Sequence, residues 1–432
     1  MSRKPRIVII GAGFGGISFV KALHKKPVEV LLIDRNNYHN FQPLMYQVAT
    51  GGLEPASIAY PIRRIFRKYK NVSLRMAEVQ RVNLAKNKIR TSIGNIKYDY
   101  LVIATGSQNN FFNFEPVKEM LLPLKTLPDA LTLRNSIFQN LERALANNRK
   151  RPLDVVMNIA IVGGGPAGLE LAGAIAEMKR FVIPIEFPDL ELSKMSINLY
   201  ESGSELLKQM STEASEKSLK YLKELGVNVF LNSRVKSYDG SKIELEDGAV
   251  FNTSTVIWTA GVKGSPIAGF PEETLIKGDR LLVDEFNKVY GTDNVFAIGD
   301  VAAHVTEEDP KGLPMLAPVA QQQGDLLAKN ILKKIRGEAM EPFDYYNKGV
   351  MATIGRNKAV VDLPHYRFQG VFAWFVWMFI HIMSLVGFRS KIVTFIDWST
   401  NYLSYDRPLG LILNSAEVLE RKEKNKKVKS KI

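Results

Sequence analysis

Residues 6–16, RIVIIGAGFGG, constrain the fold more than any other stretch, because an apolar run leads directly into Gly11-x-Gly13-x-x-Gly16. In such a motif Gly11 makes a tight turn, Gly13 lets a pyrophosphate approach the backbone, and Gly16 lets the helix pack on the strand. The helix N-terminus then binds the phosphates through free N–H groups and its dipole. A second apolar run, 28–33, ends at Asp34, whose carboxylate can bind ribose hydroxyls. This order of elements predicts a nucleotide site.

The pattern begins again at residue 158, where NIAIVGGGPAGLELA contains Gly163-x-Gly165-x-x-Gly168. Each copy is followed by an apolar strand and a small-residue turn, Ala104-Thr105-Gly106 in the first and Thr259-Ala260-Gly261 in the second. The first glycine lies 95 residues before the turn glycine in the first copy and 98 residues before it in the second. The repeat predicts an α/β fold with two Rossmann-like domains, each with its own dinucleotide.

The second domain has its own candidate ribose acid, Glu201, at the end of the predicted strand SINLYE. It follows Gly168 by 33 residues, where about 20 is usual. The insertion FVIPIEFPDLELSKM accounts for the excess. No Lys or Arg follows Glu201 until Lys208, so a 2′-phosphate would meet a carboxylate and no cation. We therefore expect NADH rather than NADPH.

Composition limits the chemistry further. The 432 residues suffice for roughly three domains, and the net charge of +14 suits an anionic ligand, membrane surface or nucleic acid. There is no cysteine, which excludes disulfides, thiolate metal sites and thiol redox chemistry, and no metal site is predicted. The first glycine motif begins at residue 11, which leaves no room for a signal peptide, so we expect synthesis in the cytosol.

The C-terminal region is unusually apolar. Residues 371–388, VFAWFVWMFIHIMSLVGF, have only His381 and Ser384 as polar side chains, and the 18 residues fall slightly short of the about 20 that span a bilayer. A second segment, 392–405, repeats apolar residues at helical spacing, and three of the four tryptophans lie in these two segments. Tryptophan beside basic residues is typical of a membrane interface. A buried dimerisation or core helix pair remains the alternative.

The tail after residue 414 carries seven Lys or Arg against three Glu, which would favour anionic lipid beside an apolar anchor. Two other segments have weaker predictions. The loop after Asp34, punctuated by Gly and Pro, is expected to line a ligand, with His39 as a surface histidine rather than a catalytic one. The segment 60–72, YPIRRIFRKYKNV, is basic and amphipathic, and a solvated cationic face explains its arginines.

GAGFGG, ATG, GGGPAG and AIGD follow one another in the order that two-dinucleotide-binding-domain flavoproteins show. Within that superfamily the chain resembles the type II NADH:quinone oxidoreductases, single-subunit NADH dehydrogenases that pump no protons. The resemblance runs nearly end to end, through FQPLMYQVATG, GGGPAGLELAGAIAE, the run before QQG and the C-terminal region.

The resemblance implies which domain takes which cofactor. FAD would bind noncovalently to residues 1–115 and 275–345, and NADH to residues 116–274, with residues 346–432 as a membrane-association region. The residues expected at FAD are Gly11, Gly13, Gly16, Asp34, Ala104, Thr105, Gly106, Gly299 and Asp300. Those expected at NADH are Gly163, Gly165, Gly168, Glu201 and Gly261.

The resemblance also implies quinone-site residues. The family often shows Ala-Gln-x-Ala-x-Gln beside the flavin, whereas this chain has Pro318 in place of the first glutamine. Gln322 matches the second glutamine, and Gln321 is a weaker candidate. Glu170 matches a glutamate that the family places near nicotinamide and quinone. The alternative for Glu170 is a helix-start carboxylate favoured by the dipole.

The expected function is FAD-dependent NADH oxidation with two-electron reduction of a membrane quinone, without proton pumping. The partners would be the quinone and the lipid surface, not nucleic acid, and a homodimer is possible. We expect monotopic attachment on the cytoplasmic face of a bacterial inner membrane, with a span at 371–388 as the alternative. The lack of cysteine argues against disulfide and sulfide:quinone oxidoreductases. A ferredoxin- or rubredoxin-type reductase, or an NADH-sensing flavoprotein like apoptosis-inducing factor, remains open.

Overall fold

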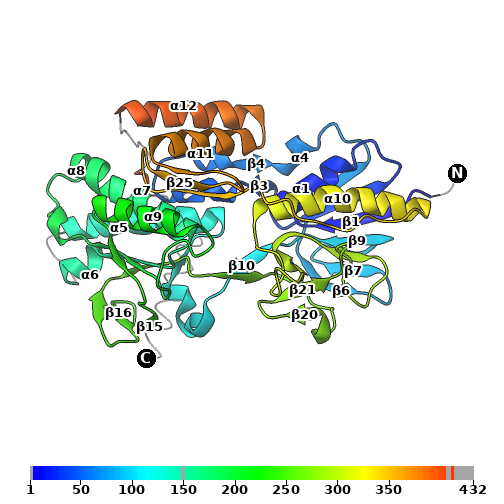
Figure 1. Cartoon of the computed structure of the whole chain (residues 1–432), viewed down its shortest axis with the longest axis horizontal. Helices are drawn as coiled ribbons and strands as arrows, with labels where there is room; N and C mark the ends of the chain where they lie inside the picture. Colours follow the sequence, from blue (N-terminus) through cyan, green and yellow to red (C-terminus); the bar gives the residue numbers. More distant parts are fainter. Residues whose placement is uncertain (1–2, 147–150, 405–409, 413–432) are drawn as a thin grey trace. The chain divides into compact units, whose positions relative to one another are not determined.

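The computed structural model describes residues 3–146, 151–404 and 410–412 (Figure 1). The chain forms two compact units, each assembled from separate stretches of sequence. Unit 1 comprises Met1–Asn40, Tyr60–Asn109 and Val262–Lys348, and unit 2 comprises Phe41–Ala59, Asn110–Gly261 and Gly349–Ile432.

Unit 1 is built on a five-stranded parallel sheet. Its strand order is β22 (Val295–Ala297), β9 (Tyr100–Ile103), β1 (Arg6–Ile10), β2 (Glu29–Asp34) and β5 (Val72–Met76). Alternate residues of β1 and β2 point to opposite faces, and both faces are covered, which is why the strand interiors, residues 7–10 and 30–33, are apolar. Ile7 and Leu32 join one core with α1 (Phe14–Ala22) and α10 (Ala317–Arg336), whereas Val8 and Ile33 join a second core.

The two helices that cover the first face of this sheet approach each other closely. A Cβ at Gly324 of α10 would overlap the Gly15 carbonyl oxygen of α1, so only glycine fits there. Smaller elements complete unit 1. They are β3 (Tyr38–Asn40), α4 (Ile62–Ile65), the antiparallel sheet β6 (Val79–Asn83), β7 (Lys88–Thr91) and β8 (Gly94–Lys97), the pair β10 (Ser107–Asn109) and β19 (Val262–Gly264), and the sheet β20 (Leu275–Ile276), β21 (Arg280–Val283) and β23 (Ala302–His304).

Unit 2 repeats the parallel architecture. Its sheet has the order β11 (Leu122–Pro123), β18 (Thr255–Trp258), β12 (Ile159–Val162), β13 (Ile197–Tyr200) and β14 (Asn228–Phe230). The main helices of this unit are α2 (Met45–Ala49), α5 (Leu127–Leu145), α6 (Leu153–Met157), α7 (Pro166–Glu177), α8 (Ile183–Glu186) and α9 (Thr212–Glu224). The short helix α3 (Pro55–Ile58) follows α2 in the chain. An antiparallel meander of β15 (Val235–Tyr238), β16 (Lys242–Leu245) and β17 (Val250–Asn252) follows β14. The predicted α/β fold with two Rossmann-like parts is confirmed.

The C-terminal part of unit 2 contains an antiparallel sheet and two helices. The sheet is β24 (Val350–Thr353), β25 (Ala359–Asp362) and β26 (Arg367–Gln369), and the helices are α11 (Val371–Ser384) and α12 (Phe388–Ser404). Asp362 accepts hydrogen bonds from the Ser211 backbone N–H (2.6 Å) and hydroxyl (3.0 Å), which ties the sheet to α9. The described residues between 349 and 404 pack into unit 2, and a separate membrane-association region at residues 346–432 stays a prediction.

The two C-terminal helices are separated by a break at residues 385–387, where Gly387 has φ +88°. The stretch 371–388 is therefore not one continuous helix. Among the residues that the structure describes, no helix is both long enough and apolar enough to cross a membrane. The basic tail after residue 414 lies outside the described residues.

Candidate functional site

The two glycine loops share one backbone geometry. Gly11 and Gly163 have φ of +108° and +115°, and a Cβ on either would collide with the backbone at residue 104 or 260. The second glycine of each motif faces open space instead, because no atom lies within 4 Å of a Cβ built on Gly13 or Gly165. Each loop thus holds a cradle next to a helix N-terminus, which fits the pyrophosphate of a dinucleotide.

Each predicted ribose acid is held against its own glycine loop. Asp34 accepts hydrogen bonds from the backbone N–H groups of Ala12 and Asn36, both at 2.7 Å. Glu201 accepts from the backbone N–H groups of Gly164 (2.6 Å) and Gly203 (2.7 Å). Burial raises the pKa of Asp34, although its two backbone donors oppose the rise. Both carboxylates are therefore fixed beside the residue that separates the first two glycines of the motif.

The remaining residues predicted at FAD gather at the carboxyl edge of the unit 1 sheet. Gly11, Ala104 and Gly299 follow the adjacent parallel strands β1, β9 and β22. In open α/β sheets, ligands bind at this edge. Gly106 has φ +69° and faces open space, and Asp300 accepts a hydrogen bond from the Ser107 hydroxyl. These residues fit a second part of a dinucleotide.

Unit 2 has the equivalent edge. Gly163, Glu201 and Gly261 follow or close the neighbouring strands β12, β13 and β18. The Gly261 turn is partly covered, because a Cβ there would lie 3.1 Å from the Phe112 ring. The arrangement again fits a dinucleotide laid across the carboxyl ends of the strands.

Glu170 lies on α7 and is 8% exposed. Burial raises its pKa to about 8, while the Thr353 backbone and the Trp377 side chain act in the opposite direction. At neutral pH this carboxyl is therefore mostly protonated. A helix dipole favours the charged form, so burial dominates over the dipole at this position.

The candidate quinone glutamines lie in the first two turns of α10. Pro318 is accommodated because the first helical turn needs no N–H donor. The Gln322 amide makes two bonds to the Tyr346 backbone, donating to its carbonyl (2.9 Å) and accepting from its N–H (3.1 Å). Gln321 is half-buried. A quinone contact by Gln322 or Gln321 remains a prediction.

Two residues were missed or misjudged from sequence. Gln323 is buried and its Oε1 accepts the Gly299 N–H at 2.7 Å, which joins α10 to the predicted FAD edge. The expectation that His39 lies on the surface is wrong, because the side chain is 2% exposed. Its Nδ1 lies 3.0 Å from the Ala12 carbonyl, and its ring packs edge-on against Phe14. Burial lowers the pKa of His39 to about 4, so it is neutral at physiological pH.

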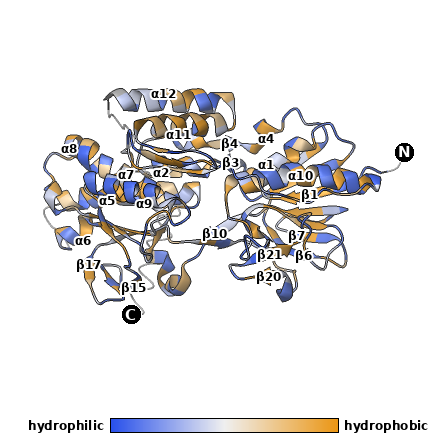
Figure 2. Ribbon diagram, viewed as in Figure 1, coloured by the Kyte–Doolittle hydropathy of each residue, from blue (hydrophilic) through white to orange (hydrophobic). Residues whose placement is uncertain are grey.

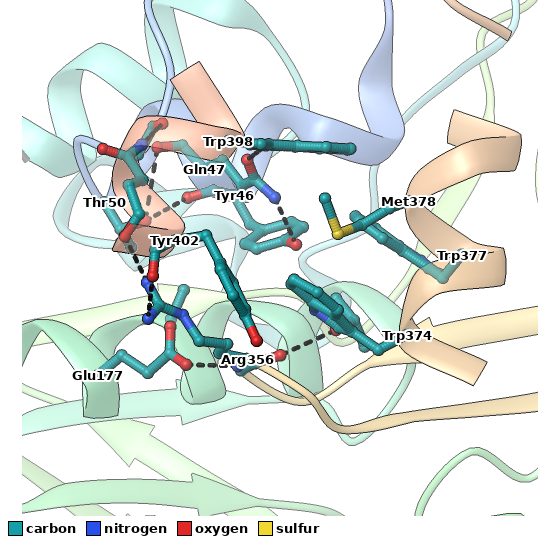
Figure 3. A pocket seen from close by; sticks show the side chains of 15 residues that line it. Tyr46, Gln47, Thr50, Glu177, Arg356, Trp374, Trp377, Met378, Trp398 and Tyr402 are labelled. Carbon is teal, nitrogen blue, oxygen red and sulfur yellow. Dashed lines mark hydrogen bonds between the residues drawn. The ribbon is translucent and has the colours of Figure 1, made fainter. Parts of the chain in front are cut away.

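Unit 2 also contains an aromatic pocket, shown in Figure 3, with about 610 Å³ of empty space including its open mouth. Five aromatic side chains line it: Tyr46, Trp374, Trp377, Trp398 and Tyr402. The lining also includes Gln47, Thr50, Glu177, Arg356 and Met378. Part of the loop predicted to line a ligand therefore does line a pocket.

Hydrogen bonds fix the side of α12 that faces this pocket. Gln47 Oε1 accepts the Trp398 indole N–H at 2.6 Å, and Gln47 Nε2 donates to the Tyr46 hydroxyl at 2.9 Å (Figure 3). The Arg356 guanidinium donates to the backbone carbonyls of Asn401 and Tyr402, the latter at 3.0 Å. These bonds tie the last turns of α12 to the rest of unit 2.

The opposite sides of α11 and α12 expose apolar side chains, and Figure 2 shows α11 as hydrophobic along most of its length. The large exposed apolar residues on these sides are Val371, Phe372, Phe375, Phe379, Ile380, Met383, Phe388, Ile392, Phe395 and Ile396. Clusters of exposed apolar side chains are typical of surfaces that contact a membrane or another protein. His381, in contrast, turns inward, stacks on Trp377 at 4.0 Å, and has a pKa lowered by burial to about 4.

Comparison with known proteins gives consistent matches along most of the chain. Residues 5–324 match the family model for pyridine nucleotide-disulphide oxidoreductases, and residues 347–405 match the NDH2 C-terminal domain. A type II NADH:quinone oxidoreductase, Ndh of Mycobacterium tuberculosis, is 32% identical over 420 residues, covering 94% of this chain and 89% of the relative. The Staphylococcus aureus type II NADH:quinone oxidoreductase is 28% identical, covering 83% and 89%.

Solved structures show the same fold. NDH2 from Plasmodium falciparum in complex with NADH has a TM-score of 0.86 at 23% identity, covering 94% of this chain and all of that one. The sulfide:quinone oxidoreductase of Aquifex aeolicus has a TM-score of 0.69 at 20% identity, covering 96% and 94%.

Proposed function

Because the chain belongs to the type II NADH:quinone oxidoreductases, we propose that it oxidises NADH and delivers two electrons to a membrane quinone without pumping protons. One observation carries the proposal: each unit has a glycine loop with a carboxylate hydrogen-bonded to it, Asp34 in unit 1 and Glu201 in unit 2. Two dinucleotide sites fit an enzyme with one bound dinucleotide cofactor and one dinucleotide substrate. FAD, when bound, supplies the two-electron chemistry between NADH and quinone.

We assign FAD to unit 1. Gly11, Gly13 and Gly16 would hold the pyrophosphate, and Asp34 would bind the ribose through carboxylate lone pairs that its two backbone donors leave free. Ala104, Thr105, Gly106, Gly299 and Asp300 form the rest of the carboxyl edge. The attachment is noncovalent in this proposal.

We assign NADH to unit 2, where Gly163, Gly165, Gly168 and Gly261 surround the loop and Glu201 takes the ribose. Its carboxylate would repel a 2′-phosphate, and residues 202–207 supply no cation to compensate. The enzyme therefore prefers NADH.

The quinone end needs protons as well as electrons, because a quinol carries two more protons than its quinone. Glu170 is protonated at neutral pH and is in contact with Trp377, which lines the aromatic pocket. In this proposal Glu170 holds a proton close to the site of quinone reduction. Gln322, and more weakly Gln321, would donate a hydrogen bond to a quinone carbonyl, and for Gln322 the amide has a second N–H besides the one that it donates to Tyr346.

The membrane contact is assigned to the exposed sides of α11 and α12. A quinone with an isoprenoid tail stays in the bilayer, so the enzyme must reach the lipid surface. The exposed rings there, such as Phe379 and Phe388, supply apolar area worth about 25 cal/mol per Å² on burial in lipid. We propose monotopic attachment on the cytoplasmic face of a bacterial inner membrane.

The test is NADH oxidation by the purified full-length protein with quinone, ferricyanide and ferredoxin compared as acceptors. We expect rapid turnover with quinone and NADH, slow turnover with NADPH, and free flavin in the supernatant after denaturation. Ferredoxin as the best acceptor would indicate a ferredoxin-type reductase. Binding of NADH without turnover on any acceptor would indicate a sensor.

A further inference from the structure

The segment around α4 in unit 1 separates its apolar and cationic side chains completely. Ile62 and Phe66 are each 4% exposed and belong to the core formed with α1 and α10, and Ile65 and Tyr69 pack against it. The five remaining side chains between residues 63 and 70 are all cations and all exposed: Arg63, Arg64, Arg67, Lys68 and Lys70.

Two further cations join this segment from the turn that follows α1. The Asn71 side-chain amide donates to the backbone carbonyls of Leu23 (2.9 Å) and Lys26 (3.4 Å). The rings of His24 and Tyr69 lie 3.9 Å apart. These contacts bring exposed Lys25 and Lys26 beside the end of the basic segment. We call the seven residues, 25, 26, 63, 64, 67, 68 and 70, the cationic surface.

The charge of the cationic surface is not neutralised nearby. Within the described part of the chain, no carboxylate lies within ion-pair distance of any of the seven residues, whereas Lys333 on α10 pairs with Glu341 at 2.6 Å. Residues 55–77 contain no Asp or Glu at all. Clustered like charges repel one another, and an anionic partner would relieve that repulsion.

We propose that the cationic surface docks on the anionic headgroups of a lipid bilayer, as a second attachment besides the apolar sides of α11 and α12. The inference rests on the proposed function, which requires a membrane acceptor.

Lipid fits the cationic surface better than nucleic acid does, for two reasons. The aromatic rings of the segment, Phe66 and Tyr69, pack inward and offer no surface for stacking bases. The helix α4 has only four residues, which is too short to read a groove.

Four of the seven cations are suitable for a test, because Arg63, Arg64, Arg67 and Lys68 are exposed and outside the predicted cofactor residues. A Lys or Arg near an anionic membrane contributes about fivefold to binding. Because the four contributions multiply, we expect the combined change to Gln at these four positions to lower the preference for anionic vesicles roughly 600-fold.

The matched control is the combined change to Gln of four exposed cations on the sheet β6 to β8 of the same unit: Arg81, Lys86, Arg90 and Lys97. Both variants lose the same charge from the same starting value of +14, so a difference between them reports position and not net charge.

The experiment measures partitioning of the full-length protein onto vesicles of neutral phosphatidylcholine and onto vesicles that also contain phosphatidylglycerol, in low salt. The ratio of the two partition coefficients should fall roughly 600-fold for the cationic-surface variant and only a few-fold for the control. Binding to neutral vesicles and NADH oxidation with ferricyanide should remain as in the wild type for both variants.

An equal loss of the ratio in both variants, or no loss in either, would overturn the proposal. A cationic-surface variant that keeps the vesicle ratio but loses binding to duplex DNA would also overturn it, in favour of nucleic acid. Failure of the proposed function is separate, because it would appear as a wild-type protein that binds vesicles but does not reduce quinone.

Discussion

The buried carboxyl of Glu170 gives a prediction about stability that its environment makes quantitative. Its pKa rises from 4.5 in the unfolded chain to about 8 in the fold, so the folded state holds a proton that the unfolded state loses above pH 4.5. The stability that this proton contributes to the fold is fully present below pH 4.5 and is lost as the pH rises through 8. The total loss is about 5 kcal/mol, at about 1.4 kcal/mol for each pH unit.

Glu170→Gln replaces the protonated carboxyl by a neutral group of similar shape and removes this pH dependence. Between pH 5.5 and 7.5, we expect the free energy of unfolding of the variant to gain about 2.5 kcal/mol relative to the wild type. Any difference in packing or hydrogen bonding adds an offset that does not change with pH. The change in the gap with pH, and not the gap itself, is therefore the quantity to measure.

Tryptophan emission during urea unfolding is a suitable assay, because all four tryptophans lie in unit 2, as Glu170 does. The unfolding free energies of wild type and variant are compared at pH 5.5, 6.5 and 7.5. Glu216→Gln, which removes an exposed carboxylate on α9 of the same unit, is the matched control. A gap between Glu170→Gln and wild type that stays constant over this range would show that Glu170 is ionised in the fold, and the reasoning from burial would fail.

Three further predictions concern cofactor, acceptor and membrane. Glu201→Gln should narrow the preference for NADH over NADPH, at least tenfold, by removing a carboxylate that repels the 2′-phosphate; an unchanged ratio of kcat/KM values would contradict the assignment. Gln322→Ala should raise the quinone KM several-fold and leave ferricyanide reduction intact, whereas equal losses with both acceptors would indicate that its bonds to Tyr346 are only structural. The double change Phe379→Gln and Phe388→Gln should weaken binding to neutral vesicles by about 3 kcal/mol for each ring, with little dependence on salt. Release of the wild-type protein from vesicles by salt alone would refute an apolar contact.

The glycine loops were predictable from sequence because their physics is local. A turn that needs φ of +108° at Gly11, and a cradle that a Cβ at Gly13 would fill, leave a pattern within six residues of the chain. The strand that precedes each loop and the acid that ends the next strand follow from topology within a short stretch. The Asp34 and Glu201 carboxylates each accept a backbone N–H of their own glycine loop, and their binding of ribose stays a prediction.

Burial of polar side chains was not predictable in the same way, because it depends on residues far along the chain. His39 sits in a segment whose polar and aromatic residues resemble a surface loop, and its burial comes from packing against Ala12 and Phe14. The pKa of Glu170 is raised by burial, while Thr353 and Trp377 oppose the rise, and no local pattern connects these distant residues to Glu170. Composition could name these residues as candidates but could not assign their protonation.

The C-terminal helices show why two opposed interpretations of one sequence can each describe part of the structure. The apolar segments suggested either a membrane contact or a buried helix pair, and helical spacing alone could not choose between them. Trp377 and Trp398 are 1% and 8% exposed, and Gln47 binds the latter, so one side of the pair is core. Phe379 and Phe388, on the same two helices, are 66% and 78% exposed. Because the inner side is held to unit 2 by hydrogen bonds, only the outer side is available to lipid, and this division is what monotopic attachment requires.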